Sequence, residues 1–177
     1  LGKAGKKKLE EKYSLNTIGR KVFDVYNGVR KRKKRILIVS HLFPPYIMGG
    51  SEIVAYEQAK VLKKMGFEIK IFAGRLNNAA EQYQIYKERG ELDVKRINLH
   101  SADVDYNFAS LDKGVLQERF REELFDVAPD AVHFHNIFPL SLKMVDQCYE
   151  MCIPTVMTLH DFWGICFKNT LLIDNGL

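Results

Sequence analysis

The sequence has few cysteines and no long hydrophobic segment. Its three cysteines, Cys148, Cys152 and Cys166, are odd in number and lack the spacing of a zinc finger. Such sparing use is typical of a reducing compartment, where thiols stay free, so we expect a cytoplasmic protein. The longest apolar runs, such as Arg35–Ser40, have the length of a strand, which excludes a transmembrane helix at the level of the sequence.

The composition is that of a globular chain. Of 177 residues, 46% are hydrophobic and 28% are charged, which suffices for one sizeable core and excludes a disordered or collagen-like chain. The first residue is Leu1, and the last residues, Asp174–Leu177, resemble a turn cut off midway. We therefore expect a fragment of a longer protein.

The net charge of +5 is unevenly distributed along the chain. Residues 1–35 carry 13 Lys and Arg against 3 acidic residues, whereas the rest carries 14 against 19. The basic leader, residues 1–34, has no apolar core for secretion, and no aromatic residues interleave its basic runs Lys6–Lys8 and Arg30–Arg35, so neither a signal peptide nor nucleic acid binding is indicated. A solvated linker is the simpler interpretation, and peripheral contact with anionic lipid at the inner face of a membrane is the alternative. Within the leader, Ile18, Val22 and Tyr26 recur at helical spacing.

Beyond the leader, residues 35–177, short apolar segments alternate with helical patterns. The expected strands are 36–40, 68–73, 94–99, 131–134 and 155–159, and the expected helices are 51–65, 79–89, 111–127 and 140–151. This alternation predicts an α/β fold, a Rossmann-like doubly wound parallel sheet flanked by helices. Ligands bind such sheets beyond the carboxyl ends of the strands, so the loops after Ser40, Phe134 and Leu159 are the candidate site.

The loop after Ser40 contains two adjacent glycines, Gly49 and Gly50, directly before an expected helix. Glycines let backbone N–H groups approach a ligand closely, and a helix N-terminus favours an anion such as phosphate, although turn formation alone is an alternative role. The loop lacks the G-x-G-x-x-G motif and the P-loop lysine. No G-x-S-x-G elbow surrounds Ser51, so a hydrolase triad is poorly supported.

The loop after the strand 131–134 follows a His-x-His sequence. Alternation along a strand places His133 and His135 on one side and Phe134 on the other. Such a pair can ligate a metal, with His160, Asp161 or His41 as a further ligand, or it can form a hydrogen-bonded pair that lines a cleft.

The loop after the strand 155–159 begins with His160 and Asp161. These two residues can act as a general base with an orienting carboxylate, or they can bind sugar hydroxyls. Trp163, the single tryptophan, can pack under a sugar ring, although a place in the core is the simpler interpretation.

Together the three loops resemble the amino-terminal domain of family-4 retaining glycosyltransferases. The similarity lies in the segments Phe43–Glu52, Pro129–Asn136 and Ile153–Asp161, which occur in the order of that family. It implies a GT-B fold, in which two Rossmann-like domains face a cleft and this chain supplies the amino-terminal, acceptor-side domain. The segment His160–Cys166 is similar to a subgroup with further cysteines downstream.

The resemblance also implies roles for individual residues. Gly49 and Gly50 would meet the donor diphosphate or sugar, and His160, with Asp161, would be the catalytic residue that contacts the donor sugar or positions the acceptor. The residues implied on the acceptor side are Glu52, His135, Asn136, Asp161 and Trp163. The leaving nucleotide diphosphate helps to deprotonate the acceptor, so no carboxylate nucleophile, cofactor or metal is implied.

The expected partners are a nucleotide-sugar donor, a glycan or lipid-linked acceptor, and a carboxyl-terminal domain that holds the nucleotide. The leader is similar to the last helix of such a carboxyl-terminal domain, which implies that it ends a preceding glycosyltransferase unit. We expect an enzyme of polysaccharide biosynthesis whose fragment alone does not turn over. The alternatives are a metal-dependent hydrolase using His133, His135 and Asp161, and a non-catalytic module that binds glycan.

Overall fold

A computed structural model describes residues 2, 5–7, 11, 33–104, 113–138 and 140–162. The chain divides into two units, Leu1–Lys33 and Lys34–Leu177. In the first unit, residues 5–7 and 11 are helical, and Lys7 Nζ lies 3.9 Å from Glu11 Oε1. The helix expected around Ile18–Tyr26 lies outside the described residues.

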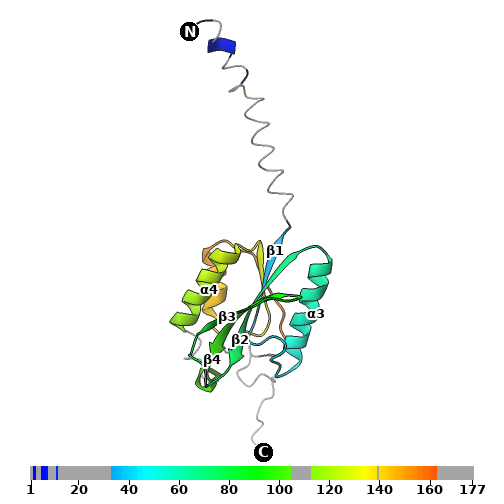
Figure 1. Ribbon diagram of the computed structural model, residues 1–177, viewed down its shortest axis with the longest axis vertical. Helices are drawn as coiled ribbons and strands as arrows, with labels where there is room; N and C mark the ends of the chain where they lie inside the picture. Colours follow the sequence, from blue (N-terminus) through cyan, green and yellow to red (C-terminus); the bar gives the residue numbers. More distant parts are fainter. Residues whose placement is uncertain are drawn as a thin grey trace, which may run out of the picture. The chain divides into compact units, whose positions relative to one another are not determined.

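The second unit is built on a six-stranded sheet with the strand order β3-β4-β2-β1-β5-β6. The strands are β1 (Arg35–Ser40), β2 (Glu68–Leu76), β3 (Ile85–Glu88), β4 (Asp93–Leu99), β5 (Ala131–Phe134) and β6 (Thr155–Met157). The helices are α3 (Gly50–Lys64), the short 3-10 helix η1 (Ser101–Val104), α4 (Gly114–Val127) and α5 (Lys143–Glu150). The sheet lies between α3 on one face and α4 with α5 on the other (Figure 1). This is the α/β fold expected from the sequence.

Both faces of the central strands are buried, which explains the continuous apolar run of β1. Leu37 and Val39 pack on the face covered by α4 and α5, whereas Ile38 packs toward α3. The α3 side needs small residues because the helix lies close to the sheet, and Ala55 and Ala59 are fully buried there.

The segment 79–89 was expected to be a helix, and this prediction is wrong. Its second half forms β3, which pairs antiparallel with β4 from Ile85↔Ile97 to Glu88↔Val94. Its first half is a turn, whose Ala80 and Glu81 carbonyls accept hydrogen bonds from the Asn98 side chain. These tertiary contacts outweigh the local helical preference of a polar segment. The sheet is consequently mixed, with four parallel pairings and one antiparallel edge.

The other expected elements are present with shifted ends. Helix α3 ends before Gly66, which has a φ of +96° and closes the helix as the sequence predicts. Helix α5 begins at Lys143 rather than at residue 140, because Leu140 closes a turn on the carbonyl of Ile137. Strand β6 ends at Met157, two residues earlier than expected.

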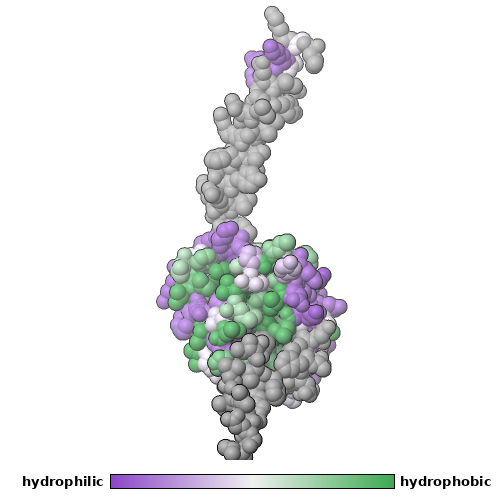
Figure 2. Space-filling view, turned by 180° about the vertical axis from the view of Figure 1, so that it is seen from behind, coloured by the Kyte–Doolittle hydropathy of each residue, from purple (hydrophilic) through white to green (hydrophobic). Residues whose placement is uncertain are grey.

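Apolar side chains gather in the middle of the face seen from behind (Figure 2). All three residues of β6 are exposed, including Val156 and Met157, and Leu159 and Phe162 beyond it are exposed too. Within the part of the chain that the structure describes, no helix combines the length and the hydrophobicity needed to span a bilayer.

Candidate active site at the carboxyl ends of β1, β5 and β6

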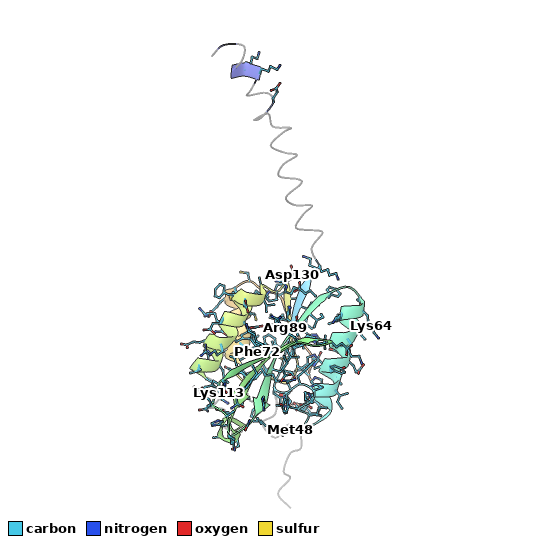
Figure 3. The ribbon with its side chains drawn as sticks, viewed as in Figure 1. Met48, Lys64, Phe72, Arg89, Lys113 and Asp130 are labelled. Carbon is cyan, nitrogen blue, oxygen red and sulfur yellow. The ribbon has the colours of Figure 1, made fainter. Side chains whose placement is uncertain are left out.

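The three loops singled out from the sequence meet at one edge of the sheet. The His41 N–H donates to the carbonyl of Asn136 (2.6 Å), and the His135 N–H donates to the carbonyl of Val39 (2.9 Å). The Thr158 N–H continues the ladder on the other side by donating to Phe134 (2.9 Å). These bonds extend the parallel pairing past the ends of β1, β5 and β6. In Figure 3, Met48 marks this edge, and Asp130 marks the opposite one.

His41 and Glu52 form a buried pair between the β1 loop and helix α3. His41 Nε2 lies 2.8 Å from Glu52 Oε1, and His41 Nδ1 lies 3.2 Å from the Asn136 carbonyl. Both ring nitrogens thus face oxygen acceptors, which only a doubly protonated ring satisfies fully. Burial nevertheless lowers the pKa of His41, although the Glu52 carboxylate opposes this effect.

Glu52 organises the start of α3. Its Oε2 accepts a hydrogen bond from the Gly49 N–H (2.8 Å), and its Oε1 accepts one from Ser51 Oγ (3.0 Å). Burial acts to raise the pKa of Glu52, but the backbone hydrogen bonds and His41 outweigh burial and lower it below the ordinary value. The side chain is fully buried, so Glu52 lies behind the surface of the site.

Three histidines stack across β5 and β6. The ring centroids of His133 and His135 are 4.6 Å apart, and those of His135 and His160 are 5.2 Å apart. His135 Nδ1 lies 2.9 Å from His160 Nε2, and His133 Nε2 lies 2.8 Å from Thr158 Oγ1. Phe134 packs on the opposite face in the core with α4, so the predicted alternation is confirmed.

His135 is held in its neutral form. Its side chain is almost fully buried, and burial, aided by the nearby His133 and His160, lowers its pKa to about 3. The hydrogen bond between His135 Nδ1 and His160 Nε2 requires one of these two nitrogens to carry the proton. His160 is half-buried, so it presents its ring to the surface of the site while His135 fixes its orientation.

The remaining expected site residues are placed as follows. Gly49 is the N-cap of α3, and Gly50 is its first residue, and both are exposed. Asn136 uses its carbonyl for His41 and its Oδ1 for the Phe138 N–H (3.0 Å). Asp161 is half-buried, and its charge acts on His41. Trp163 and Cys166 lie outside the described residues.

The geometry gives no particular support to a hydrolase. Among residues 33–104, 113–138 and 140–162, no three His, Cys, Asp or Glu side chains are arranged as metal ligands. His133 uses its Nε2 for a hydrogen bond with Thr158 Oγ1, and His135 uses its Nδ1 for a hydrogen bond with His160 Nε2.

Two residues that support the site were missed in the sequence. Arg96 on β4 is fully buried, and its Nη1 and Nη2 donate to the carbonyls of Phe43 (2.9 Å) and Pro44 (2.6 Å). A Cβ on Gly74 of β2 would lie 2.2 Å from the His41 carbonyl oxygen. An arginine in the middle of an apolar strand was the available signal for the first, because a charge there requires buried acceptors.

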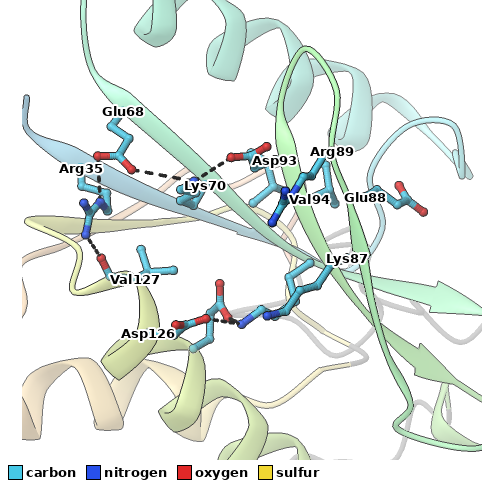
Figure 4. A pocket seen from close by; sticks show the side chains of 13 residues that line it. Arg35, Glu68, Lys70, Lys87, Glu88, Arg89, Asp93, Val94, Asp126 and Val127 are labelled. Atoms are coloured by element: carbon cyan, nitrogen blue, oxygen red, sulfur yellow. Dashed lines mark hydrogen bonds and ion pairs between the residues drawn. The ribbon is translucent and has the colours of Figure 1, made fainter.

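A cavity of about 570 Å³ lies at the opposite edge of the sheet, where β1, β2 and β4 begin (Figure 4). Two of the ion pairs that line it join neighbouring strands: Arg35 with Glu68 (3.0 Å) and Lys70 with Asp93 (2.7 Å). A third, Lys95 with Asp126 (3.0 Å), joins β4 to helix α4. Its charges largely satisfy one another, so this cavity is separate from the histidine site in both place and chemistry.

Comparison with solved structures shows the fold. Sucrose-phosphate synthase from Thermosynechococcus elongatus superposes with a TM-score of 0.52 at 13% identity, over 73% of this chain and 34% of that protein. The catalytic domain of starch synthase IV from Arabidopsis thaliana, bound to ADP and acarbose, gives a TM-score of 0.46 at 15% identity, over 74% and 34%. The chain thus spans about a third of the length of these two proteins. It shares the fold of the matched part of sucrose-phosphate synthase, a GT-B glycosyltransferase. No curated protein sequence matches the chain.

Comparison with family models identifies the lineage. The model described as Glycosyltransferase Family 4 matches residues 48–173. This match begins in the loop between β1 and α3, residues 41–49, which we call the glycine loop. It includes the loops after β5 and β6 and covers well over half of the chain. The chain therefore belongs to glycosyltransferase family 4.

Proposed function

We propose that the chain is the acceptor-side domain of an enzyme that transfers a sugar from a nucleotide-sugar to a hydroxyl of a glycan or other acceptor, with retention at the anomeric carbon. The observation that carries this proposal is the hydrogen bond between His135 and His160 at the ends of β5 and β6, beside the His41–Glu52 pair. It fixes one half-exposed imidazole at the edge where α/β sheets bind ligands.

His160 is suited to bind a hydroxyl group. Its Nε2 is engaged by His135, so Nδ1 is the ring nitrogen left to meet the donor sugar or to position the acceptor. An imidazole nitrogen can accept or donate a hydrogen bond there, depending on which nitrogen of the ring carries the proton. Asp161, the next residue, lines the same loop. In this scheme the leaving diphosphate takes the acceptor proton, and no protein carboxylate attacks the sugar.

The start of α3 is suited to meet the donor diphosphate. The first-turn N–H groups of a helix lack intrahelical acceptors and attract anions. The Gly49 N–H is already bound by Glu52, so the amides of Gly50 and Ser51 are the better candidates. A Cβ on Gly50 would have no protein atom within 4 Å, which leaves room for close approach by a ligand.

The rest of the catalytic machinery is inferred to lie outside this chain. We propose that a carboxyl-terminal domain binds the nucleotide, that no metal or cofactor is needed, and that the enzyme builds polysaccharide on the cytoplasmic side. We also keep the proposal that residues 1–34 end a preceding unit of the same polypeptide. The chain by itself should then fold without transferring sugar.

Sugar-nucleotide turnover tests this proposal. Purified full-length protein and the 177-residue chain are incubated with UDP-, GDP- and ADP-sugars, and released nucleotide and retained anomeric configuration are measured. Turnover by the full-length protein only, lost in its His160→Ala variant, is expected. Folded full-length protein that is silent with every donor, or transfer by the chain alone, would contradict it, and full turnover in His160→Ala would contradict the role given to His160.

A further inference from the structure

Arg75 at the end of β2 lies between two tyrosine rings. Its guanidinium carbon is 5.2 Å from the ring centroid of Tyr46 and 4.9 Å from that of Tyr86. Tyr46 belongs to the loop after β1, whereas Tyr86 belongs to β3. Two elements that are distant in the sequence thus hold this side chain at the carboxyl edge of the sheet.

The neighbouring Arg96 has a structural role, and its contacts differ from those of Arg75. Arg96 also stacks on Tyr46 (4.9 Å), but it is fully buried and bonded to the Phe43 and Pro44 carbonyls and to Glu88 (2.7 Å). Arg75 is half-buried, and among the residues that the structure describes no carboxylate lies within ion-pair distance of it. Arg96 therefore accounts for the fixing of the loop, whereas no residue that the structure describes accepts a hydrogen bond from the Arg75 guanidinium.

Contact with two aromatic rings prepares a guanidinium for binding. The rings attract the cation without using its N–H donors, so the planar edge that carries those donors is the part that a ligand meets. That edge matches an oxyanion, which can accept two parallel hydrogen bonds from it. Because the rings restrict the side chain beforehand, less conformational entropy is lost when the anion binds.

The position of Arg75 places the bound anion beside the loop between β1 and α3. In the sheet order, β2 and β5 lie on opposite sides of β1, so Arg75 and the histidine stack flank the loop that leads to Gly49. Tyr46 lies three residues before Gly49 in that loop. We propose that Arg75 binds a phosphate or carboxylate group of a ligand that lies on the far side of the glycine loop from His160. This binding of an anion does not depend on the proposed function.

Titration with simple anions tests the site on the 177-residue chain. Inorganic phosphate and, separately, acetate are added at constant ionic strength while the backbone amide signals of residues 46, 75 and 86 are followed by NMR, since every variant retains them. We expect saturable binding that is weakened about tenfold or more in Arg75→Gln, because charge-assisted hydrogen bonds are lost, and weakened less in Arg75→Lys. The matched control is Arg121→Gln, which removes an exposed arginine paired with Glu150 on the other face and should bind as the wild type does. Preference for phosphate or for acetate identifies the anion class.

A second pair of variants tests the stacking. Tyr86→Phe keeps the ring and should leave the affinity unchanged, whereas Tyr86→Leu removes the ring but no charge and should weaken binding severalfold, with thermal unfolding as the check on folding. Equal affinity in Arg75→Gln and wild type would overturn the proposal, and equal affinity in Tyr86→Leu would overturn the role of the rings. If the Arg75-dependent anion site exists but the full-length protein transfers no sugar, the proposed function fails and this inference stands.

Discussion

His135 makes the site sensitive to acid. Its pKa is lowered from 6.5 to about 3 by burial, so the folded protein binds its proton far less readily than the unfolded chain does. His133 and His41 have lowered pKa values for the same reason. When folding lowers the pKa of a group, the contribution of that group to the free energy of unfolding is fully present above its unfolded pKa. The contribution is lost as the pH falls toward the folded pKa.

We therefore predict that the free energy of unfolding falls as the pH decreases from about 6.5 toward 3. The His135 contribution alone amounts to a loss of about 2 kcal/mol at pH 5. His135→Asn keeps a polar atom near the Nδ1 position but cannot titrate, so its stability should vary less with pH, the remaining slope coming from His133 and His41. Urea unfolding at several pH values measures this, and an equally steep profile in the variant would count against a neutral His135.

Two glycines that look alike in the sequence should respond differently to alanine. A Cβ on Gly74 would meet the His41 carbonyl at 2.2 Å and Leu99 Cδ1 at 2.9 Å, whereas a Cβ on Gly50 meets open space. We predict that Gly74→Ala lowers the free energy of unfolding by about 1–3 kcal/mol, as overpacking does. Gly50→Ala should melt like the wild type.

The functional effect of Gly50→Ala is a separate prediction. Because the protein itself leaves room for the methyl group, any loss of affinity must arise from the ligand side. We expect weaker binding of the nucleotide-sugar by the full-length enzyme, seen as a raised KM with a largely unchanged melting temperature. An unchanged KM would place the donor away from the start of α3.

At the scale of elements, helix α4 ends with an unfavourable residue. Ala128 caps it at φ 45° and ψ 61°, a left-handed conformation that costs a residue with a Cβ about 1–2 kcal/mol. Glycine relieves this strain but loses about 0.4–1 kcal/mol through greater freedom of the unfolded chain. Ala128→Gly should thus raise the free energy of unfolding by about 0.5–1 kcal/mol.

Ala59→Gly is the control for this prediction. Ala59 lies in the interior of α3, where glycine should cost about 1 kcal/mol or more. Denaturant unfolding of the two variants should therefore give shifts of opposite sign, and a loss of stability in both would show that Ala128 is not strained.

The elements that could be predicted are those whose pattern is set by burial on the sheet itself. The positions of β1, β2, β4 and β5 could be predicted from their apolar runs. The alternation of side chains along β5 predicted that His133 and His135 lie on the same face of the sheet. The segment 79–89 could not be assigned correctly, because its state depends on pairing with β4 and on the Asn98 side chain. The contacts of Arg96, Gly74 and Arg75 could not be predicted either, since each depends on a loop contributed by another element, although the charge of Arg96 in an apolar strand indicated that it needs buried acceptors.

At the scale of the whole molecule, the second unit contains the entire described sheet and both hydrophobic clusters. We predict that residues 34–177 fold without residues 1–33, with a melting temperature close to that of the whole chain. Differential scanning calorimetry of both proteins checks this. A markedly lower melting temperature in the shorter protein would show that the leader stabilises the sheet.

The bonds from Arg96 to the carbonyls of Phe43 and Pro44 have a consequence for synthesis. The glycine loop leaves the ribosome some fifty residues before the side chain that fixes it. Until β4 has been translated and has joined the sheet, a nascent chain can hold β1, α3 and β2 while its glycine loop still lacks the Arg96 bonds. The order of translation therefore leaves the glycine loop without these bonds after β1 and α3, the elements on both sides of it, have already been made.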